Sequence, residues 1–121
     1  MRLTALRGAI TAEANDANAI VTATTELLTE VMERNGLGAD EMVSCIFTCT
    51  SDLNAEFPAV AARQLGLSQV PLLCAQEIDV YNAMPHVIRL LLHCHVPEDR
   101  EVSHVYLRDA VGLRKDLQGA Q

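Results

Sequence analysis

Residues 86–96, HVIRLLLHCHV, form an apolar run with an arginine near its centre. The run is far shorter than the roughly 20 residues of a membrane span, and it predicts a β-strand that is apolar on both faces. Alternate residues of a strand share a face. One face would carry Val87, Arg89, Leu91, His93 and His95. A guanidinium keeps its charge in a protein, so we expect an anion to meet Arg89.

Four more strands are expected around this one, which covers 86–95. Their alternation of side chains and their content of β-formers predict strands over 1–10, 42–50, 70–75 and 103–107. In the first of them we expect Arg7 at the end of the strand, just before Gly8. With two helices between the early strands, the order is β-α-β-α-β-β-β. This order predicts an α+β fold with a mixed five-stranded sheet.

The two helices differ in length. The longer is expected over 15–35, starting at Asn15 or Asp16 and stopping at Gly36. The shorter is expected over about 58–65, where Pro58 suits the first helical position and Gly66 the end. One long and one short helix are too few to cover both faces of five strands. A homo-oligomer that buries the second face is therefore predicted.

The length and composition limit the organisation and the partners. The chain has 121 residues, which predicts one domain over 1–121, and the small polar residues of 115–121 predict a flexible tail. Its net charge of −7 argues against nucleic acid as a partner. No stretch predicts a membrane span or a signal peptide. We therefore expect a cytoplasmic protein whose four cysteines are reduced.

Eight of the nine basic residues are arginines, and a general arginine bias of the genome would explain this count equally well. Four of them occupy positions of interest: Arg7, Arg63, Arg89 and Arg114. For each alone, a surface salt bridge is the plainer explanation. Arginine is nevertheless the side chain best shaped to bind carboxylates and phosphates.

Three other polar groups accompany the arginines. Glu77 directly follows the third strand, Cys74 lies three residues earlier, and Tyr106 belongs to the last strand. A plain exposed carboxylate and a thiol packed as a small apolar group remain alternatives. The chain has no glycine-rich phosphate loop, nucleotide-binding fingerprint or nucleophile elbow. These residues indicate a site for a small polyanionic ligand rather than for nucleophilic chemistry.

A metal site is the main alternative from the residues themselves. His93 and His95 share a strand face with Cys94 between them, and Cys45 and Cys49 are the candidates for further ligands. Zinc needs three or four such ligands, and neither CxxC nor HExxH occurs. The alternative is that His93, Cys94 and His95 only pack at a sheet face or a subunit contact.

Five segments together resemble the small monofunctional chorismate mutases of the AroH class: LRGAIT, TSDLNAEFPAVAAR, VPLLCAQEIDV, VIRLLLH and HVYLRDAVGLRKDL. They occur in the order and spacing of that family and cover nearly the whole chain. The resemblance implies a homotrimer that forms a pseudo-α/β-barrel with clefts between neighbouring subunits. It also implies the Claisen rearrangement of the chorismate dianion to prephenate, with no covalent intermediate and no cofactor.

The resemblance further implies roles for single residues. Arg7 would bind a substrate carboxylate, with the Tyr106 hydroxyl donating beside it. Glu77 would accept a hydrogen bond from the ring hydroxyl, near Cys74. Arg89 would face the ether oxygen between the ring and the enolpyruvyl side chain.

The remaining implied residues surround the substrate. Phe57 and Leu113 would form apolar walls, with Ala59 beside the ring. Arg63 and Arg114 would attract the dianion at the cleft mouth. The chain departs from the family pattern at Val60, where many members carry a basic residue, and at Lys115, where a proline is more familiar. Both departures concern substrate capture more than the chemical step.

Two other functions remain open at this point. One is a trimeric module that keeps the fold and binds small anions without catalysis. The other is the metal-binding protein described above. The joint presence of Arg7, Glu77, Arg89 and Tyr106 favours the enzyme over the binding module.

Overall fold

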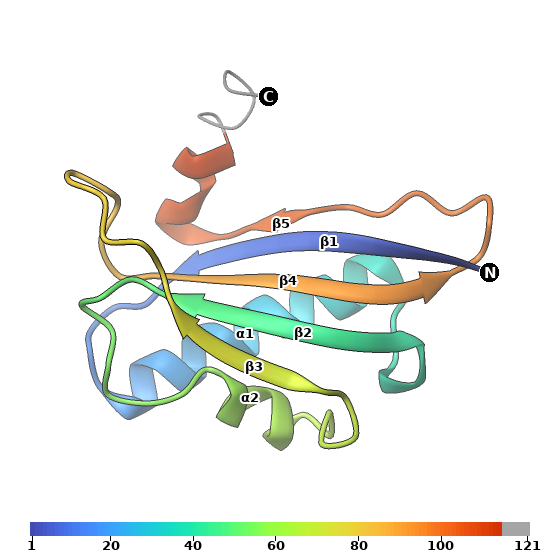
Figure 1. The fold of residues 1–121 in the computed structure, drawn as a ribbon, viewed down its shortest axis with the longest axis horizontal. Helices are drawn as coiled ribbons and strands as arrows, with labels where there is room; N and C mark the ends of the chain where they lie inside the picture. The colour runs from blue at the N-terminus through green and yellow to red at the C-terminus, as the bar shows by residue number, and fades with distance from the viewer. Residues whose placement is uncertain (115–121) are drawn as a thin grey trace.

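The computed structural model describes residues 1–114, so the predicted tail at 115–121 lies outside the described part. It contains a mixed five-stranded sheet in the order β3-β2-β4-β1-β5 (Figure 1). The strands are β1 (Arg2–Thr11), β2 (Met42–Cys49), β3 (Leu72–Gln76), β4 (Val87–Val96) and β5 (Val105–Tyr106). β4 is antiparallel to both β1 and β2, whereas β3 is parallel to β2 and β5 is parallel to β1. The predicted α+β class, the mixed five-stranded sheet and the order of strands and helices along the chain are confirmed.

The long helix α1 (Ala17–Asn35) has the ends that the sequence predicts. Of the two candidate caps it uses Asp16, whose side chain accepts a hydrogen bond from the Ala19 N–H at 2.7 Å. The helix ends at Gly36, which takes the left-handed conformation with φ 61°. The short helix α2 (Ala59–Gln64) follows Pro58, and Gly66 lies beyond its end with φ 89°.

Both helices pack on the same face of the sheet, behind the strands in the view of Figure 1. Their apolar side chains and the inward-facing side chains of the strands form the core. Its largest fully buried members include Leu6, Ile10, Ile20, Leu27, Leu28, Phe47, Ile88 and Leu92. Burial of such aliphatic and aromatic side chains is the main source of folding free energy. No helix among residues 1–114 is both long and apolar enough to cross a bilayer.

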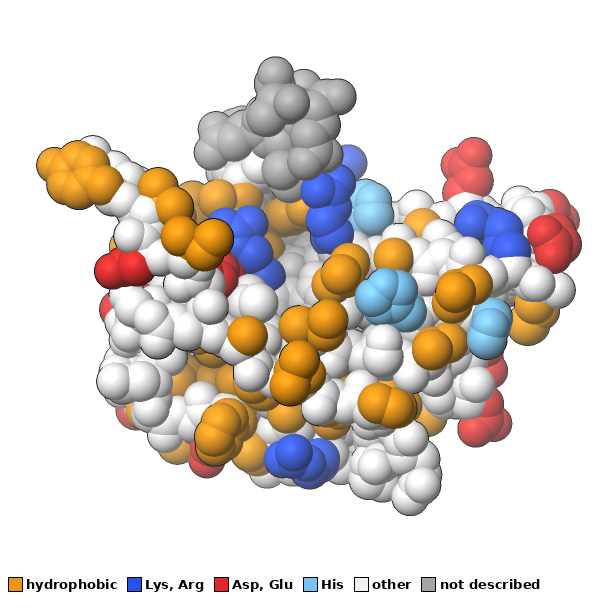
Figure 2. Space-filling view, in the orientation of Figure 1, with side chains coloured by type: hydrophobic (Ala, Val, Ile, Leu, Met, Phe, Trp, Pro, Cys, Tyr) orange, Lys and Arg blue, Asp and Glu red, His pale blue; other side chains and the backbone are white. Residues whose placement is uncertain are grey.

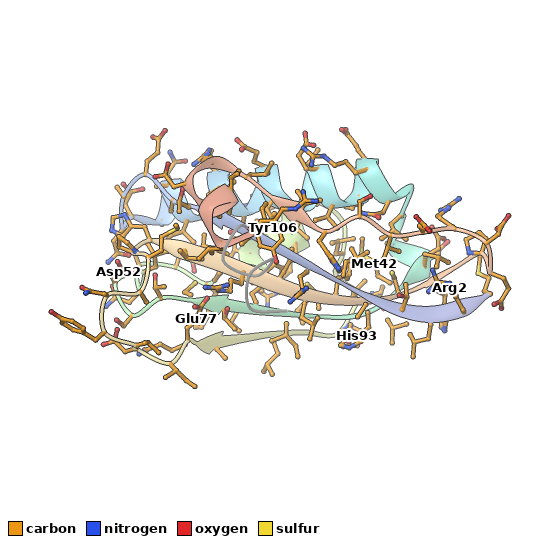
Figure 3. All side chains as sticks on the ribbon, turned by 90° about the horizontal axis from the view of Figure 1, so that it is seen from above. Arg2, Met42, Asp52, Glu77, His93 and Tyr106 are labelled. Atoms are coloured by element: carbon orange, nitrogen blue, oxygen red, sulfur yellow. The ribbon has the colours of Figure 1, made fainter. Side chains whose placement is uncertain are left out.

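The opposite face of the sheet, called the open face below, has no helix packed across its centre in the described chain. It exposes Leu3 to 60%, Leu73 to 61% and Leu91 to 37%. Figure 2 views this face and shows apolar and histidine side chains scattered over it. In Figure 3, His93 points away from α1 on this side. The prediction that the helices leave one sheet face uncovered is confirmed.

Arg7 does not end its strand, because β1 continues through Gly8 to Thr11. The glycine serves close packing here rather than a turn. A Cβ at Gly8 would lie 3.2 Å from the Leu27 side chain and 3.3 Å from the Val105 carbonyl oxygen. Arg7 is therefore a central residue of β1, opposite Leu91.

β5 is shorter than the predicted 103–107 because a side chain binds the backbone before it. The buried Asn35, at the end of α1, accepts a hydrogen bond from the Ser103 N–H at 2.7 Å and donates to the Ser103 carbonyl at 3.0 Å. It also donates to the Val31 carbonyl at 2.9 Å. Asn35 thus fixes the chain just before Tyr106.

We expect Asn35→Leu to lower the free energy of unfolding by about 1–3 kcal/mol, because it removes three hydrogen bonds from a buried amide. Urea unfolding measures the loss. Asn18→Leu is the matched control: Asn18 is exposed on the same helix, and its replacement should change stability by less than about 0.5 kcal/mol. Equal stability of the two variants would contradict the role given to Asn35.

Candidate active site

The register of the sheet brings three predicted site residues, Arg7, Arg89 and Tyr106, to the same face. Ala9 of β1 lies opposite Arg89 on one side and Tyr106 on the other, and Arg89 lies opposite Thr48. Residues opposite each other in a sheet share a face, so Arg89, Thr48 and Tyr106 lie on the open face. Arg7 lies on the same face one row away.

Arg89 forms an ion pair with Glu77, which follows β3. Its Nε donates to both carboxylate oxygens, at 3.1 Å to Oε1 and 3.0 Å to Oε2. Thr48 donates its hydroxyl to Oε2 at 2.8 Å, and the Glu77 N–H bonds the Cys49 carbonyl at 2.9 Å. Within residues 1–114, neither terminal nitrogen of Arg89 donates a hydrogen bond to the protein. The guanidinium is therefore fixed through Nε, and its two Nη groups keep their hydrogen-bonding capacity on a side chain that is 39% exposed.

Arg89 is not buried in the single chain, although its apolar neighbours suggested that it would be. Its side chain is 39% exposed, because it leaves the open face while Ile88 and Leu90 turn into the core. The anion expected to meet it is supplied by the chain itself, as Glu77, whose side chain is only 16% exposed.

A small apolar cluster covers one end of the open face beside this pair. Ala9, Val87 and Ala110 are buried there, with Met84, Tyr106 and Leu113 packed against them. Ala110 belongs to the 3-10 turn η2 (Arg108–Ala110), which leads the chain to Leu113 and Arg114. The structure thus places Tyr106 and Leu113, and with them the neighbouring Arg114, at the end of the sheet where Ala9 pairs with Arg89. Figure 3 shows Tyr106 and Glu77 at this end.

The other predicted residues form a second group on the helix side of the sheet. Cys74 lies opposite Phe47, whose side chain is in the core, so Cys74 and Arg89 lie on opposite faces. Phe57, 64% exposed, and Cys74 both line a cavity of about 340 Å³ beside α2. Arg63 is exposed on α2, whereas Ala59 is buried under it. One chain does not bring Cys74 to the Glu77 carboxylate.

The cysteines and histidines do not assemble into a metal site. Cys94 is buried in the core while His93 and His95 face the other way, and His93 lies 3.2 Å from the Ser44 hydroxyl. Burial, and secondly Cys74, raises the pKa of Cys45 to about 12; burial also raises the pKa of Cys49 to about 12. Their thiols are thus protonated at neutral pH. Among residues 1–114 no three His, Cys, Asp or Glu are placed to hold a metal ion.

Two residues near the site were missed from the sequence. Thr48 holds Glu77, and the β-pattern of residues 42–50 could have separated its side chain from those of the neighbouring Phe47 and Cys49, which lie on the other face. The second is His104, whose Nδ1 accepts a hydrogen bond from the Arg7 backbone N–H at 2.9 Å. It precedes Tyr106 by two residues, and that spacing on a strand would have placed both on one face.

A comparison with protein families identifies the chain. The family model described as chorismate mutase type I matches residues 3–117. The chain belongs to the chorismate mutase type I family. Family membership assigns it an isomerase activity, that of a chorismate mutase, and neither the metal-binding nor the non-catalytic alternative gains support.

Known chorismate mutases are similar to this chain over nearly its full length and theirs. A protein of Thermus thermophilus described as chorismate mutase AroH is 50% identical over 119 residues, covering 96% of this chain and 97% of the relative. One of Bacillus subtilis (strain 168) with the same description is 38% identical over 120 residues, covering 97% and 94%. A solved chorismate mutase from Clostridium thermocellum matches with a TM-score of 0.87 and 44% identity, covering 90% of this chain and 98% of that one.

Proposed function

We propose that the chain rearranges chorismate to prephenate, a step of phenylalanine and tyrosine biosynthesis, with Arg89 as the group that stabilises the transition state. The observation that carries this assignment is the fixed guanidinium: Glu77 holds Nε, and Arg89 shares the open face with Arg7 and Tyr106. In this Claisen rearrangement the ether C–O bond breaks as a C–C bond forms. No proton is transferred and no covalent intermediate forms.

Electrostatics accounts for the acceleration. The breaking C–O bond leaves negative charge on the ether oxygen in the transition state. A cation already aimed at that oxygen interacts more strongly with the transition state than with the substrate, which is the condition for catalysis. Because Glu77 and Thr48 hold the guanidinium before substrate arrives, little reorganisation is needed at the moment of reaction.

The other residues hold the substrate in its reactive shape. Arg7 and Tyr106 bind a carboxylate on the open face, and Glu77 accepts a hydrogen bond from the ring hydroxyl. Fixing the enolpyruvyl arm over the ring removes rotational freedom that the free substrate must lose to react. The proposed reaction uses no cofactor.

We propose further that the site is completed by a second chain in a homotrimer. Arg7, Glu77, Arg89, Tyr106, Leu113 and Arg114 form the open-face group. Phe57, Ala59, Arg63 and Cys74 form the α2 group on the other side of the sheet, so one cleft takes each group from a different chain. The exposed Leu3, Leu73 and Leu91 support burial of the open face between subunits, as a pseudo-α/β-barrel would provide.

Arg63 and Arg114 line the mouth of this cleft and attract the dianion. Val60, half-buried on α2, supplies no cation there, and Lys115 lies outside the described residues. We also propose a cytoplasmic location, which suits four cysteines that are all free thiols.

The direct test is to follow the loss of chorismate absorbance after adding the purified protein. We expect saturable turnover far above the uncatalysed rate, with prephenate as the product. Conversion no faster than in buffer would overturn the proposed function.

A further inference from the structure

The bond between Arg7 and His104 takes the place of a rung in the β1–β5 ladder. β5 pairs through only two residues, Val105 with Gly8 and Tyr106 with Ala9. One residue earlier the same register sets His104 beside Arg7. There the Arg7 N–H donates to the imidazole Nδ1 at 2.9 Å instead of to a backbone carbonyl. The backbone of Arg7 is thus tied to β5 by a side chain.

The imidazole of His104 lies beside the proposed carboxylate site. His104 and Tyr106 are alternate residues of an extended segment, so both face the side that carries Arg7 and Arg89. The charged groups that face the ring are Arg7 from β1 and Arg114 from the C-terminal segment. Burial first, and then these two positive charges, lower the pKa of His104 from its ordinary 6.5. The ring is therefore neutral at pH 7, with its proton on Nε2.

We propose that His104 is a positioning residue for substrate binding, which holds Arg7 in place through the Nδ1 hydrogen bond and does so only while the imidazole is neutral. The proposal rests on the carboxylate-binding role of Arg7 proposed above and adds a residue to it. His104 makes no contact with the reacting atoms. It acts through the position of β1 at Arg7.

Protonation of His104 would break this arrangement for two reasons. An imidazolium donates from both nitrogens, so Nδ1 no longer accepts the Arg7 N–H. It also adds a third positive charge next to Arg7 and Arg114. Folding lowers the pKa of His104. The hydrogen bond from the Arg7 N–H to Nδ1 is therefore intact above that lowered pKa and is lost as the pH falls through it.

Three variants separate the acceptor from the bulk of the ring. His104→Asn keeps an acceptor, Oδ1, at the distance of Nδ1 from the backbone, His104→Gln moves the acceptor one bond further out, and His104→Ala removes it. We expect KM for chorismate to rise about fivefold in the Ala and Gln variants, the factor expected for one hydrogen bond. The Asn variant should stay within about twofold of wild type, and kcat should change little in all three.

The pH profile gives an independent measure. KM of the wild-type protein should rise as the pH is lowered below 6.5, whereas KM of His104→Asn should stay flat. An Asn variant as impaired as the Ala variant would overturn the proposal. So would an Ala variant with unchanged KM and a lower melting temperature, because a merely structural histidine would behave in that way.

Failure of the proposed function gives a different result. If the wild-type protein does not turn over chorismate, or if Arg7→Ala binds it normally, the carboxylate role of Arg7 is wrong. The hydrogen bond can still be followed by NMR without substrate. The Arg7 amide proton should shift with pH together with the His104 ring, and this shift should vanish in His104→Ala. An Arg7 amide insensitive to His104 would by itself overturn the positioning role.

Discussion

Arg89→Ala is expected to lower kcat/KM for chorismate by at least about a hundredfold while the protein remains folded. Loss of one aligned, preorganised donor from an active site typically costs about 3 kcal/mol of transition-state stabilisation. The side chain is 39% exposed in the single chain, so its removal opens no cavity in the core. Steady-state kinetics and the circular dichroism spectrum measure the two parts of this prediction.

Arg34→Ala is the matched control. Arg34 also uses its Nε to bind a carboxylate, that of Glu30 at 2.8 Å, but it does so on α1. Its removal should leave turnover unchanged. Arg89→Lys should be severely impaired too, because an ammonium on a different stem does not place two donors where the Nη groups lie. Near-normal turnover by Arg89→Ala would refute the role proposed for this residue.

The elements of the fold could be predicted because their signals are local. Asp16 and Gly36 bound α1 through contacts within one turn, and the alternation of β4 places Arg89 and Leu91 on one face. The place of Arg7 within β1 could not be predicted locally. Arg7 was expected at the end of the strand, just before Gly8, but the strand continues to Thr11. Gly8 instead permits the close approach of Leu27, which lies 19 residues further along the chain.

The site was predictable in its residue types and less so in its contacts. The resemblance singled out Arg89 and Glu77 separately, yet their ion pair depends on the parallel pairing of β3 with β2, which brings Glu77 next to Thr48. Likewise, His104 meets Arg7 only because β5 pairs with β1 across 97 residues of sequence. Long-range register of this kind is not encoded in any short segment.

The separation of the two groups of site residues predicts that inactive variants will complement each other. Phe57→Asp places a carboxylate where the dianion is expected to meet an apolar wall, so we expect kcat/KM to fall by about a hundredfold or more, since like charges brought together cost several kcal/mol. Phe57 is 64% exposed, and the change should not disturb folding. The Phe57→Asp chain keeps an intact open-face group, whereas the Arg89→Ala chain keeps an intact α2 group.

When equal amounts of Arg89→Ala and Phe57→Asp chains are unfolded together and reassembled, some clefts should combine the intact group of each. With random mixing, a cleft takes its open-face group from a Phe57→Asp chain half of the time, and its α2 group from an Arg89→Ala chain half of the time. About a quarter of the wild-type activity should therefore return. The control is a mixture of Arg89→Ala with Arg7→Ala, whose defects lie in the same group, and it should recover nothing. If mixed oligomers form, as two different tags would prove, and activity does not return, the site does not draw its two groups from different chains.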